Sequence, residues 1–166
     1  MTTIISQSVK TDWLFLVPLV NLTNKTYMLN RIKVCVIGGG SWATAIVKML
    51  CENLDEVGWY MRSTYAIEHL KRHGHNPNYL SQATFNPANL KFFEDINKAV
   101  SYGNYLIFAV PSAFLQSELE KLKVSLLNKN IFSAIKGIVP ESGLIVGKHF
   151  HQKYGVSYDQ IGVITG

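Results

Sequence analysis

The sequence predicts a doubly wound α/β fold, in which a mostly parallel sheet carries helices on both of its faces. Three observations support this prediction. Short apolar runs alternate with longer segments of helical pattern along most of the chain. One run, residues 105–110 (YLIFAV), is almost wholly apolar, as is typical of a parallel strand that is covered on both faces. Another run, residues 33–37, leads directly into three glycines and a helix.

Taken in order, the apolar runs and the turn residues between them predict six strands and five helices. The predicted strands are residues 33–37, 56–61, 90–93, 105–110, 131–135 and 161–165. The predicted helices are residues 41–53, 65–72, 95–100, 113–127 and 144–154. Thr64 and Ser112 are the expected N-caps of the second and fourth helices, because their hydroxyls can accept hydrogen bonds from the first turn. Glu118 is expected among the polar residues of the fourth helix.

The glycine-rich turn after the first strand reads Gly-Gly-Gly-Ser-Trp-Ala over residues 38–43. Gly38 permits a tight turn, and Gly40 lacks a Cβ, so the backbone there can approach a pyrophosphate closely. Ala43 allows the following helix to pack near the strand, and the unpaired N–H groups at the start of that helix favour phosphate. A strand, a Gly-x-Gly-x-x-Ala turn and a helix are typical of a Rossmann-type dinucleotide-binding domain. The alternative is a glycine turn that binds nothing.

The end of the second strand bears on the choice of cofactor. NAD-binding units carry an Asp or Glu about twenty residues after the glycines, where it binds the ribose hydroxyls. This chain has Met61, Arg62 and Ser63 there, without a carboxylate. Arg62 can pair with a 2′-phosphate or stack on adenine, and the alternative is a solvated surface arginine. The sequence therefore favours NADP, or a site that accepts both NADP and NAD.

Two further candidates follow later strands. Pro111 ends the fourth strand, and Lys136 comes directly after the fifth. Because ligands of open α/β sheets bind outside the carboxyl ends of the strands, Lys136 is placed to bind phosphate or to polarise a carbonyl. The alternative for Lys136 is a surface lysine.

Composition and residue spacing argue against other classes of protein. The net charge is +5, but the basic residues are scattered, so nucleic-acid binding is not expected. Cys35 and Cys51 suit buried, reduced thiols of a cytosolic protein better than a disulfide or zinc site. The histidine pairs at 73 and 75 and at 149 and 151 are expected at the surface, not as metal ligands, and no metal site is predicted.

Residues 1–30 read differently from the rest. Their apolar stretch, residues 13–20, is interrupted by Pro18 and is too short to span a bilayer, so no membrane segment is expected. We expect this N-terminal extension to be poorly ordered or a start-site artefact, with Met28 as the natural start. The alternatives are an arm that packs on the domain and a signal peptide.

Residues 37–45 resemble the opening motif of the bacterial NAD(P)-dependent glycerol-3-phosphate dehydrogenases, although that family usually has glycine at the position of Ala43. Four later segments are similar to the same family, in order along the chain: residues 75–80, 109–112, 134–137 and 164–166. The resemblance covers about residues 31–166, which form the predicted dinucleotide-binding domain.

The resemblance implies a cofactor, NADP or NAD, and two substrates, glycerone phosphate and sn-glycerol 3-phosphate. The implied cofactor-binding residues are Gly38, Gly39, Gly40, Ser41, Trp42, Arg62, Pro111 and Lys136. The implied substrate-binding residues are Lys136 and Gly166. The implied setting is a cytoplasmic enzyme that supplies glycerophospholipid synthesis, with a homodimer as the expected state of the full-length protein.

The same family has a second, mostly helical domain that carries the general acid/base lysine, and this sequence ends before it. We therefore expect no catalytic residue in this chain, which should bind cofactor but turn over substrate negligibly. The alternatives are a non-catalytic NADP-binding module and the cofactor domain of another Rossmann-type dehydrogenase.

Overall fold

The computed structural model divides the chain into two units, residues 1–31 and residues 32–166, and it describes residues 32–165. The predicted N-terminal extension with Met28 and the predicted substrate contact Gly166 therefore lie outside the described residues. Within the described residues, no helix is long and apolar enough to cross a membrane.

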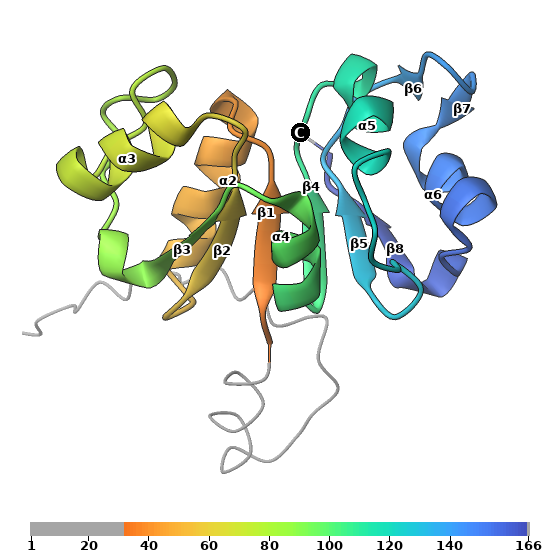
Figure 1. The fold of residues 1–166 in the computed structure, drawn as a ribbon, viewed down its shortest axis with the longest axis horizontal. Helices are drawn as coiled ribbons and strands as arrows, with labels where there is room; N and C mark the ends of the chain where they lie inside the picture. Colours follow the sequence, from red (N-terminus) through yellow and green to blue (C-terminus); the bar gives the residue numbers. More distant parts are fainter. Residues whose placement is uncertain (1–31, 166) are drawn as a thin grey trace, which may run out of the picture. The chain divides into compact units, whose positions relative to one another are not determined.

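A six-stranded parallel sheet forms the centre of the described unit (Figure 1). Its strands are β1 (Val34–Ile37), β2 (Val57–Tyr60), β3 (Leu90–Phe93), β4 (Tyr105–Phe108), β5 (Asn130–Ser133) and β8 (Ile161–Val163). They lie in the order β3-β2-β1-β4-β5-β8, and every neighbouring pair is parallel. The direction of winding reverses between β1 and β4, which makes their carboxyl ends the switch point of the sheet.

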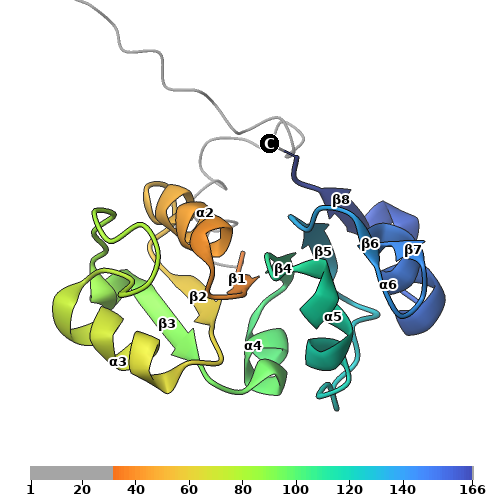
Figure 2. The same cartoon turned by 90° about the horizontal axis from the view of Figure 1, so that it is seen from above.

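Five helices cover the two faces of this sheet. They are α2 (Ser41–Cys51), α3 (Thr64–His73), α4 (Ile96–Tyr102), α5 (Ser112–Leu119) and α6 (Val146–Tyr154). Apolar residues of α2 and α3 pack in one core with Val36 and Trp59. Those of α4, α5 and α6 pack in a second core with Ile37 and Phe108. Figure 2 shows α2 on the opposite side of the strands from α4 and α5. The predicted doubly wound sheet is confirmed.

The fourth predicted helix is shorter than expected, because α5 ends at Leu119 and not at residue 127. The side chain of Asn97, in α4, forms hydrogen bonds with the backbone groups that would otherwise continue α5. The Asn97 amide donates to the Lys121 carbonyl across 3.1 Å, and its oxygen accepts from the Lys123 N–H across 2.6 Å. These contacts replace intrahelical hydrogen bonds, so the chain turns away despite its amphipathic pattern.

Both predicted N-caps are displaced by one residue. Ser63, not Thr64, caps α3, and its hydroxyl accepts from the Ala66 N–H across 3.1 Å. Pro111 occupies the N-cap position of α5, and Ser112 is the first helical residue. A proline at this position has no side-chain acceptor, so its φ of −59° directs the chain into the helix instead.

A small antiparallel hairpin between β5 and α6 was not predicted. It consists of β6 (Ile138–Val139) and β7 (Leu144–Ile145), and α6 therefore begins at Val146 and not at residue 144. Two-residue strands are too short to show an apolar period. The turn between them uses Gly143 at φ +64°, whose N–H donates to the Val139 carbonyl across 2.8 Å. Two short 3-10 helices, η2 (Pro87–Asn89) and η3 (Tyr158–Gln160), complete the unit.

Candidate functional site

The loops that follow β1, β4 and β5 all begin at the carboxyl ends of the strands, the edge of the sheet that faces the viewer in Figure 2. Two hydrogen bonds hold the ends of these strands together. The Ala109 N–H donates to the Ile37 carbonyl across 2.9 Å, and the Ala134 N–H donates to the Phe108 carbonyl across 2.9 Å. The candidate site is built on this edge, where open α/β sheets bind their ligands.

Gly38 is the residue at which the chain leaves β1, and its backbone has φ +136°, a region that favours glycine. A Cβ placed there would lie 2.4 Å from the Ala109 carbonyl oxygen. The Gly38 N–H donates to the Tyr60 carbonyl across 3.0 Å, and its carbonyl accepts from the Trp59 indole N–H across 2.7 Å. The loop is therefore held against β4 at a distance that only glycine permits.

Gly40 differs from Gly38 because a Cβ there would meet nothing within 4 Å. It is the N-cap residue of α2, and no side chain among the described residues caps this helix start. The N–H groups of the first helical turn therefore have no side-chain acceptor among the described residues, and the helix dipole there favours an anion. This arrangement fits a phosphate group of a dinucleotide. Ser41 and Trp42, the first two residues of α2, are both exposed.

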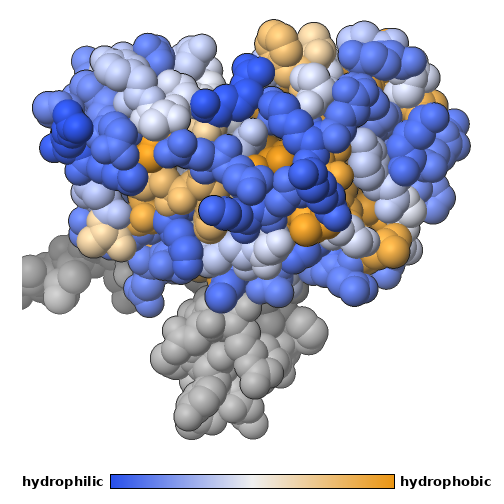
Figure 3. Space-filling view, in the orientation of Figure 1, coloured by the Kyte–Doolittle hydropathy of each residue, from blue (hydrophilic) through white to orange (hydrophobic). Residues whose placement is uncertain are grey.

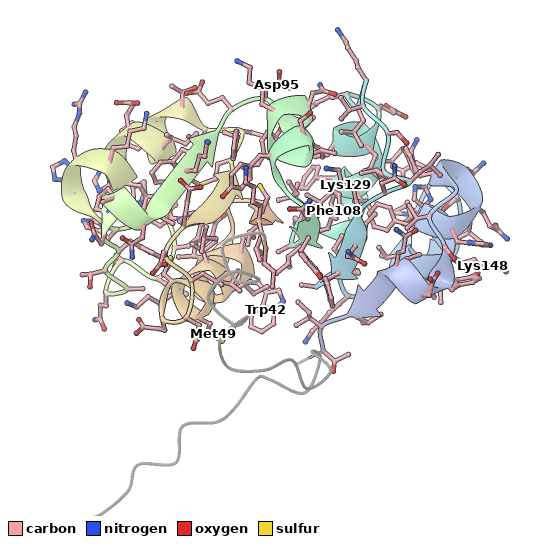
Figure 4. The ribbon with its side chains drawn as sticks, turned by 90° about the horizontal axis from the view of Figure 1, so that it is seen from below. Trp42, Met49, Asp95, Phe108, Lys129 and Lys148 are labelled. Carbon is pink, nitrogen blue, oxygen red and sulfur yellow. The ribbon has the colours of Figure 1, made fainter. Side chains whose placement is uncertain are left out.

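Trp42 was also expected to contact the cofactor. Its side chain is 39% exposed, and it lies with Met49 on the side of α2 that faces away from Asp95 (Figure 4). Trp42 is the second residue of α2, and it forms no aromatic pair among the described residues.

Asn76 is a buried part of the site for which the sequence predicts no role. It is 1% exposed, and its amide donates to the Thr44 hydroxyl across 2.9 Å and to the Gly39 carbonyl across 3.3 Å. Its oxygen accepts from the Asn78 N–H across 3.0 Å. Asn76 thus ties the loop after α3 to the glycine-rich loop. Its place in the segment 75–80 was the available signal, but spacing alone does not join residues so far apart.

Arg62 follows β2 and lies over α5. Its guanidinium carbon is 5.3 Å from the centroid of the Phe114 ring, and its Nη1 is 3.5 Å from Oε1 of Glu118. A stacked and paired arginine differs from the freely solvated alternative. The side chain remains 58% exposed, so one face of it can still meet a ligand.

Glu118, expected among the polar residues of its helix, is buried and only 1% exposed. Its Oε2 accepts from the Tyr60 hydroxyl across 2.8 Å, and its Oε1 lies 2.9 Å from the Lys121 ammonium. Burial and the neighbouring Glu118 carboxylate raise the pKa of Tyr60 above its ordinary range. Burial of a charged carboxylate is tolerated here because Tyr60, Lys121 and Arg62 compensate it.

A pocket of about 330 Å³ opens beside these residues. Its lining holds two basic side chains, two carboxylates and two partly apolar groups: Tyr60, Arg62, Glu94, Asp95, Ile96 and Lys121. The pocket adjoins the end of β2, where the sequence predicts the adenosine end of a dinucleotide.

Lys136 and Pro111 come from loops that meet at the same edge. Lys136 is exposed and lies three residues after β5, which ends at Ser133 and not at residue 135 as predicted. The next residue, Gly137, has φ +91°, and its Cβ position lies 4.0 Å from the Ser112 hydroxyl at the start of α5. The loop after β5 therefore lies beside the start of α5, which follows Pro111. Phe114, in the first turn of α5, is 46% exposed, and Figure 3 shows hydrophobic atoms over this end of the helix.

The cysteines and histidines of the described residues show no disulfide and no cluster placed to hold a metal ion. Cys35 and Cys51 are unbonded to each other, and burial raises the pKa of Cys35 to about 12 and that of Cys51 to about 11. His149 corrects the expectation of a surface histidine, because it is 1% exposed within α6. In the part of the chain that the structure describes, no three His, Cys, Asp or Glu side chains are placed to hold a metal ion.

Fold and loop together define the class: a dinucleotide-binding domain of the Rossmann type, with its glycine-rich loop at the switch point of the sheet. The chain belongs to the family described as the NAD-dependent glycerol-3-phosphate dehydrogenase N-terminus, whose model matches residues 33–166. The resemblance noted in the sequence is confirmed, and the alternative of a different dehydrogenase family is set aside.

Similar proteins agree with this assignment. The glycerol-3-phosphate dehydrogenase [NAD(P)+] of Lysinibacillus sphaericus is 38% identical over 112 residues, which are 66% of this chain and 32% of that protein. The protein of the same name from Malacoplasma penetrans is 30% identical over 135 residues, 79% of this chain and 39% of that protein. The chain therefore spans about a third to two fifths of the relatives it matches.

A solved structure supports the fold. The glycerol-3-phosphate dehydrogenase of Saccharomyces cerevisiae superimposes with a TM-score of 0.68 at 24% sequence identity. The superposition covers 81% of this chain and 42% of the yeast chain.

Proposed function

We propose that the described domain binds NADP or NAD for a glycerol-3-phosphate dehydrogenase, an enzyme that interconverts glycerone phosphate and sn-glycerol 3-phosphate. The observation that carries this proposal is the glycine-rich loop at the switch point. There the start of α2 has no side-chain cap from the described residues and lies beneath open space at Gly40. The family membership and the names of the relatives support the same activity.

The residues divide between two sides of the switch point. The start of α2 would bind the pyrophosphate through backbone N–H groups. Arg62, after β2, would bind the adenosine end, and Lys136, after β5, lies on the other side. The proposed cofactor-binding set is Gly38, Gly39, Gly40, Ser41, Trp42, Arg62, Pro111 and Lys136.

When bound, the nicotinamide cofactor supplies the hydride that reduces the carbonyl carbon of glycerone phosphate, or accepts it in the reverse direction. The residues of this chain would hold and orient the cofactor and the substrate. The exposed Lys136 ammonium can bind the substrate phosphate or polarise the carbonyl oxygen as negative charge develops on it. Gly166 is the second proposed substrate contact.

Hydride transfer requires the reactive carbon of the cofactor to be held against the substrate carbonyl in a fixed geometry. We propose that this geometry needs the helical domain implied by the family resemblance. The 166-residue chain should then bind NADPH and NADH but not oxidise them when glycerone phosphate is added.

The test is a fluorescence titration of the purified chain with NADH and with NADPH, followed by an assay with glycerone phosphate. Saturable binding supports the cofactor proposal, and the absence of binding by both cofactors would overturn it. Oxidation of NADPH that depends on glycerone phosphate, well above a control without protein, would overturn the proposed need for a second domain.

The wider setting follows from the same activity. A glycerol-3-phosphate dehydrogenase in the cytoplasm would supply the backbone for glycerophospholipid synthesis, and we propose this role and place. We also propose a homodimer for the full-length protein and no nucleic-acid partner, since the basic residues of the chain are scattered.

A further inference from the structure

We propose that the buried carboxylate of Glu118 limits the preference of this site for NADPH over NADH, acting through Arg62 and Lys121. The inference rests on the proposed function, because it takes the pocket beside Arg62 as the adenosine end of the cofactor site. It goes further by naming a residue that sets the choice between two cofactors that differ only in a 2′-phosphate.

The geometry makes one carboxylate the shared partner of two cations. The Lys121 ammonium lies 2.9 Å from Oε1 of Glu118, and Nη1 of Arg62 lies 3.5 Å from the same oxygen. The other oxygen, Oε2, accepts from the Tyr60 hydroxyl across 2.8 Å. Oε1 therefore faces the cations, while Tyr60 fixes the orientation of the carboxylate.

Exposure separates the two cations from the anion beneath them. The side chains of Arg62 and Lys121 are 58% and 48% exposed, whereas that of Glu118 is 2% exposed. Arg62 and Lys121 both line the pocket of about 330 Å³, and Glu118 is not among its lining residues. A ligand in the pocket would thus contact Arg62 and Lys121 directly, and Glu118 would affect its binding only through these two cations.

The charges of the pocket oppose a strong preference for the 2′-phosphate. Arg62 and Lys121 supply two positive charges, and Glu94 and Asp95, which also line the pocket, supply two negative ones. Glu118 adds a third carboxylate that is already paired with both cations. A 2′-phosphate must compete with Glu118 for the same ammonium and guanidinium groups, and a 2′-hydroxyl does not. Glu118 therefore weakens the binding of NADPH relative to NADH.

The first test is Glu118→Gln in the full 166-residue chain, with dissociation constants for NADH and NADPH measured by fluorescence titration. Glutamine keeps an acceptor for Tyr60 and removes the competing charge. We expect the affinity for NADPH relative to NADH to rise about five- to tenfold, the effect of freeing one charge-assisted contact. A ratio that is unchanged or that falls would overturn the inference, because a merely structural role would affect both cofactors alike.

A second variant covers the case in which Glu118→Gln does not fold. Lys121→Met removes a half-exposed cation and leaves Glu118 to pair with Arg62 alone. We expect the NADPH-to-NADH affinity ratio to fall about threefold or more. The matched control is Lys148→Met, which removes an exposed lysine of α6, far from Asp95 in Figure 4, and should leave the ratio unchanged. An unchanged ratio in Lys121→Met would overturn the inference.

The outcomes separate this inference from the proposed function. If the unmodified chain binds neither cofactor, the proposed function fails. If it binds both and the ratio does not respond to Glu118→Gln or Lys121→Met, only the role of Glu118 fails. Raising the salt concentration should shrink the expected shifts, because Arg62 and Lys121 are exposed enough to be screened.

Discussion

The side-chain amide of Asn76 donates a hydrogen bond to the hydroxyl of Thr44 across 2.9 Å. This contact joins a turn after α3 to the first turns of α2, 32 residues earlier in the chain. The same Thr44 hydroxyl donates to the Gly40 carbonyl across 2.9 Å. Asn76 thus supports the candidate site indirectly, because its hydrogen bonds hold the glycine-rich loop and the start of α2 in place.

Replacing Asn76 with alanine should destabilise the domain and weaken cofactor binding together. The buried Thr44 hydroxyl and the Gly39 carbonyl would lose a donor, at a cost of about 2 kcal/mol. Urea unfolding and NADH titration measure the two effects. The control is Asn78→Ala, in which only an exposed side chain is lost. Equal behaviour of the two variants would contradict the role given to Asn76.

Alanine at Gly38 and at Gly40 should separate folding from binding. The Cβ of Gly38→Ala would lie 2.4 Å from the Ala109 oxygen on a backbone at φ +136°, so this variant should lose about 3 kcal/mol of stability or more. Gly40 has φ −80° and open space around it, so Gly40→Ala should fold nearly normally. Its methyl group would occupy the space proposed for the pyrophosphate and weaken NADH binding about tenfold or more.

These two glycine variants are checked by thermal unfolding and by calorimetric titration with NADH. Undiminished affinity in Gly40→Ala would show that the space above the loop is not the pyrophosphate site. Normal stability in Gly38→Ala would show that the loop can move away from β4.

Lys136→Met should change ligand binding without changing stability. The side chain is exposed, so the midpoint of thermal unfolding should stay within about 2 °C of the parent. The proposed contact of the ammonium with the cofactor should be lost, which raises the dissociation constant for NADH about threefold to tenfold. An exposed lysine of α6 supplies the comparison, as Lys148→Met. Identical affinities of these two variants would exclude Lys136 from the site.

The buried His149 should make the stability of the domain depend on pH. Burial, and then the charge of Lys153, lower the pKa of His149 below its ordinary value of 6.5, and Glu141 opposes this in part. Its Nδ1 lies 3.0 Å from the Ser142 hydroxyl, and Nε2 has no partner among the described residues.

The direction in which stability changes with pH follows from this lowered pKa of His149. On acidification the unfolded chain binds a proton at His149 first, so this contribution to stability is full above pH 6.5, falls as the pH drops from 6.5 toward the lower folded-state pKa, and levels off below it. Urea unfolding at pH 7.5, 6.5 and 5.5 should show a smaller loss for His149→Gln than for the unmodified chain. Parallel losses would contradict the assignment of this pH dependence to His149.

Much of the fold could be predicted from the sequence, because buried parallel strands appear in it as short, nearly continuous apolar runs. The run at residues 105–110 and the strand before the glycines were placed within a few residues of β4 and β1. The end of α5 could not be predicted in this way. The side chain of Asn97, from α4, takes up the backbone of Lys121 and Lys123, and such a contact between distant segments has no local pattern.

The candidate site shows the same division. Gly38 and Gly40 could be predicted as site residues from the sequence. Only glycine readily tolerates a positive φ or a close approach of a ligand to the backbone, so the residue type itself indicates the role. Glu118 was expected among the polar residues of its helix because it is charged, whereas three partners, from β2, the loop after β2 and the turn after α5, allow it to be buried. Burial of a charge depends on partners that only the folded chain brings together.

The central claim is that the loop of Gly38–Gly40 and the start of α2 bind the pyrophosphate of NADPH or NADH. The most direct measurement is a two-dimensional ¹⁵N–¹H spectrum of the labelled chain during titration with NADH. We predict that the largest shift changes fall on the backbone N–H groups of residues 39–43, with smaller changes near Arg62 and Lys136. Saturable changes that leave residues 39–43 unmoved, or no changes at all, would contradict the claim.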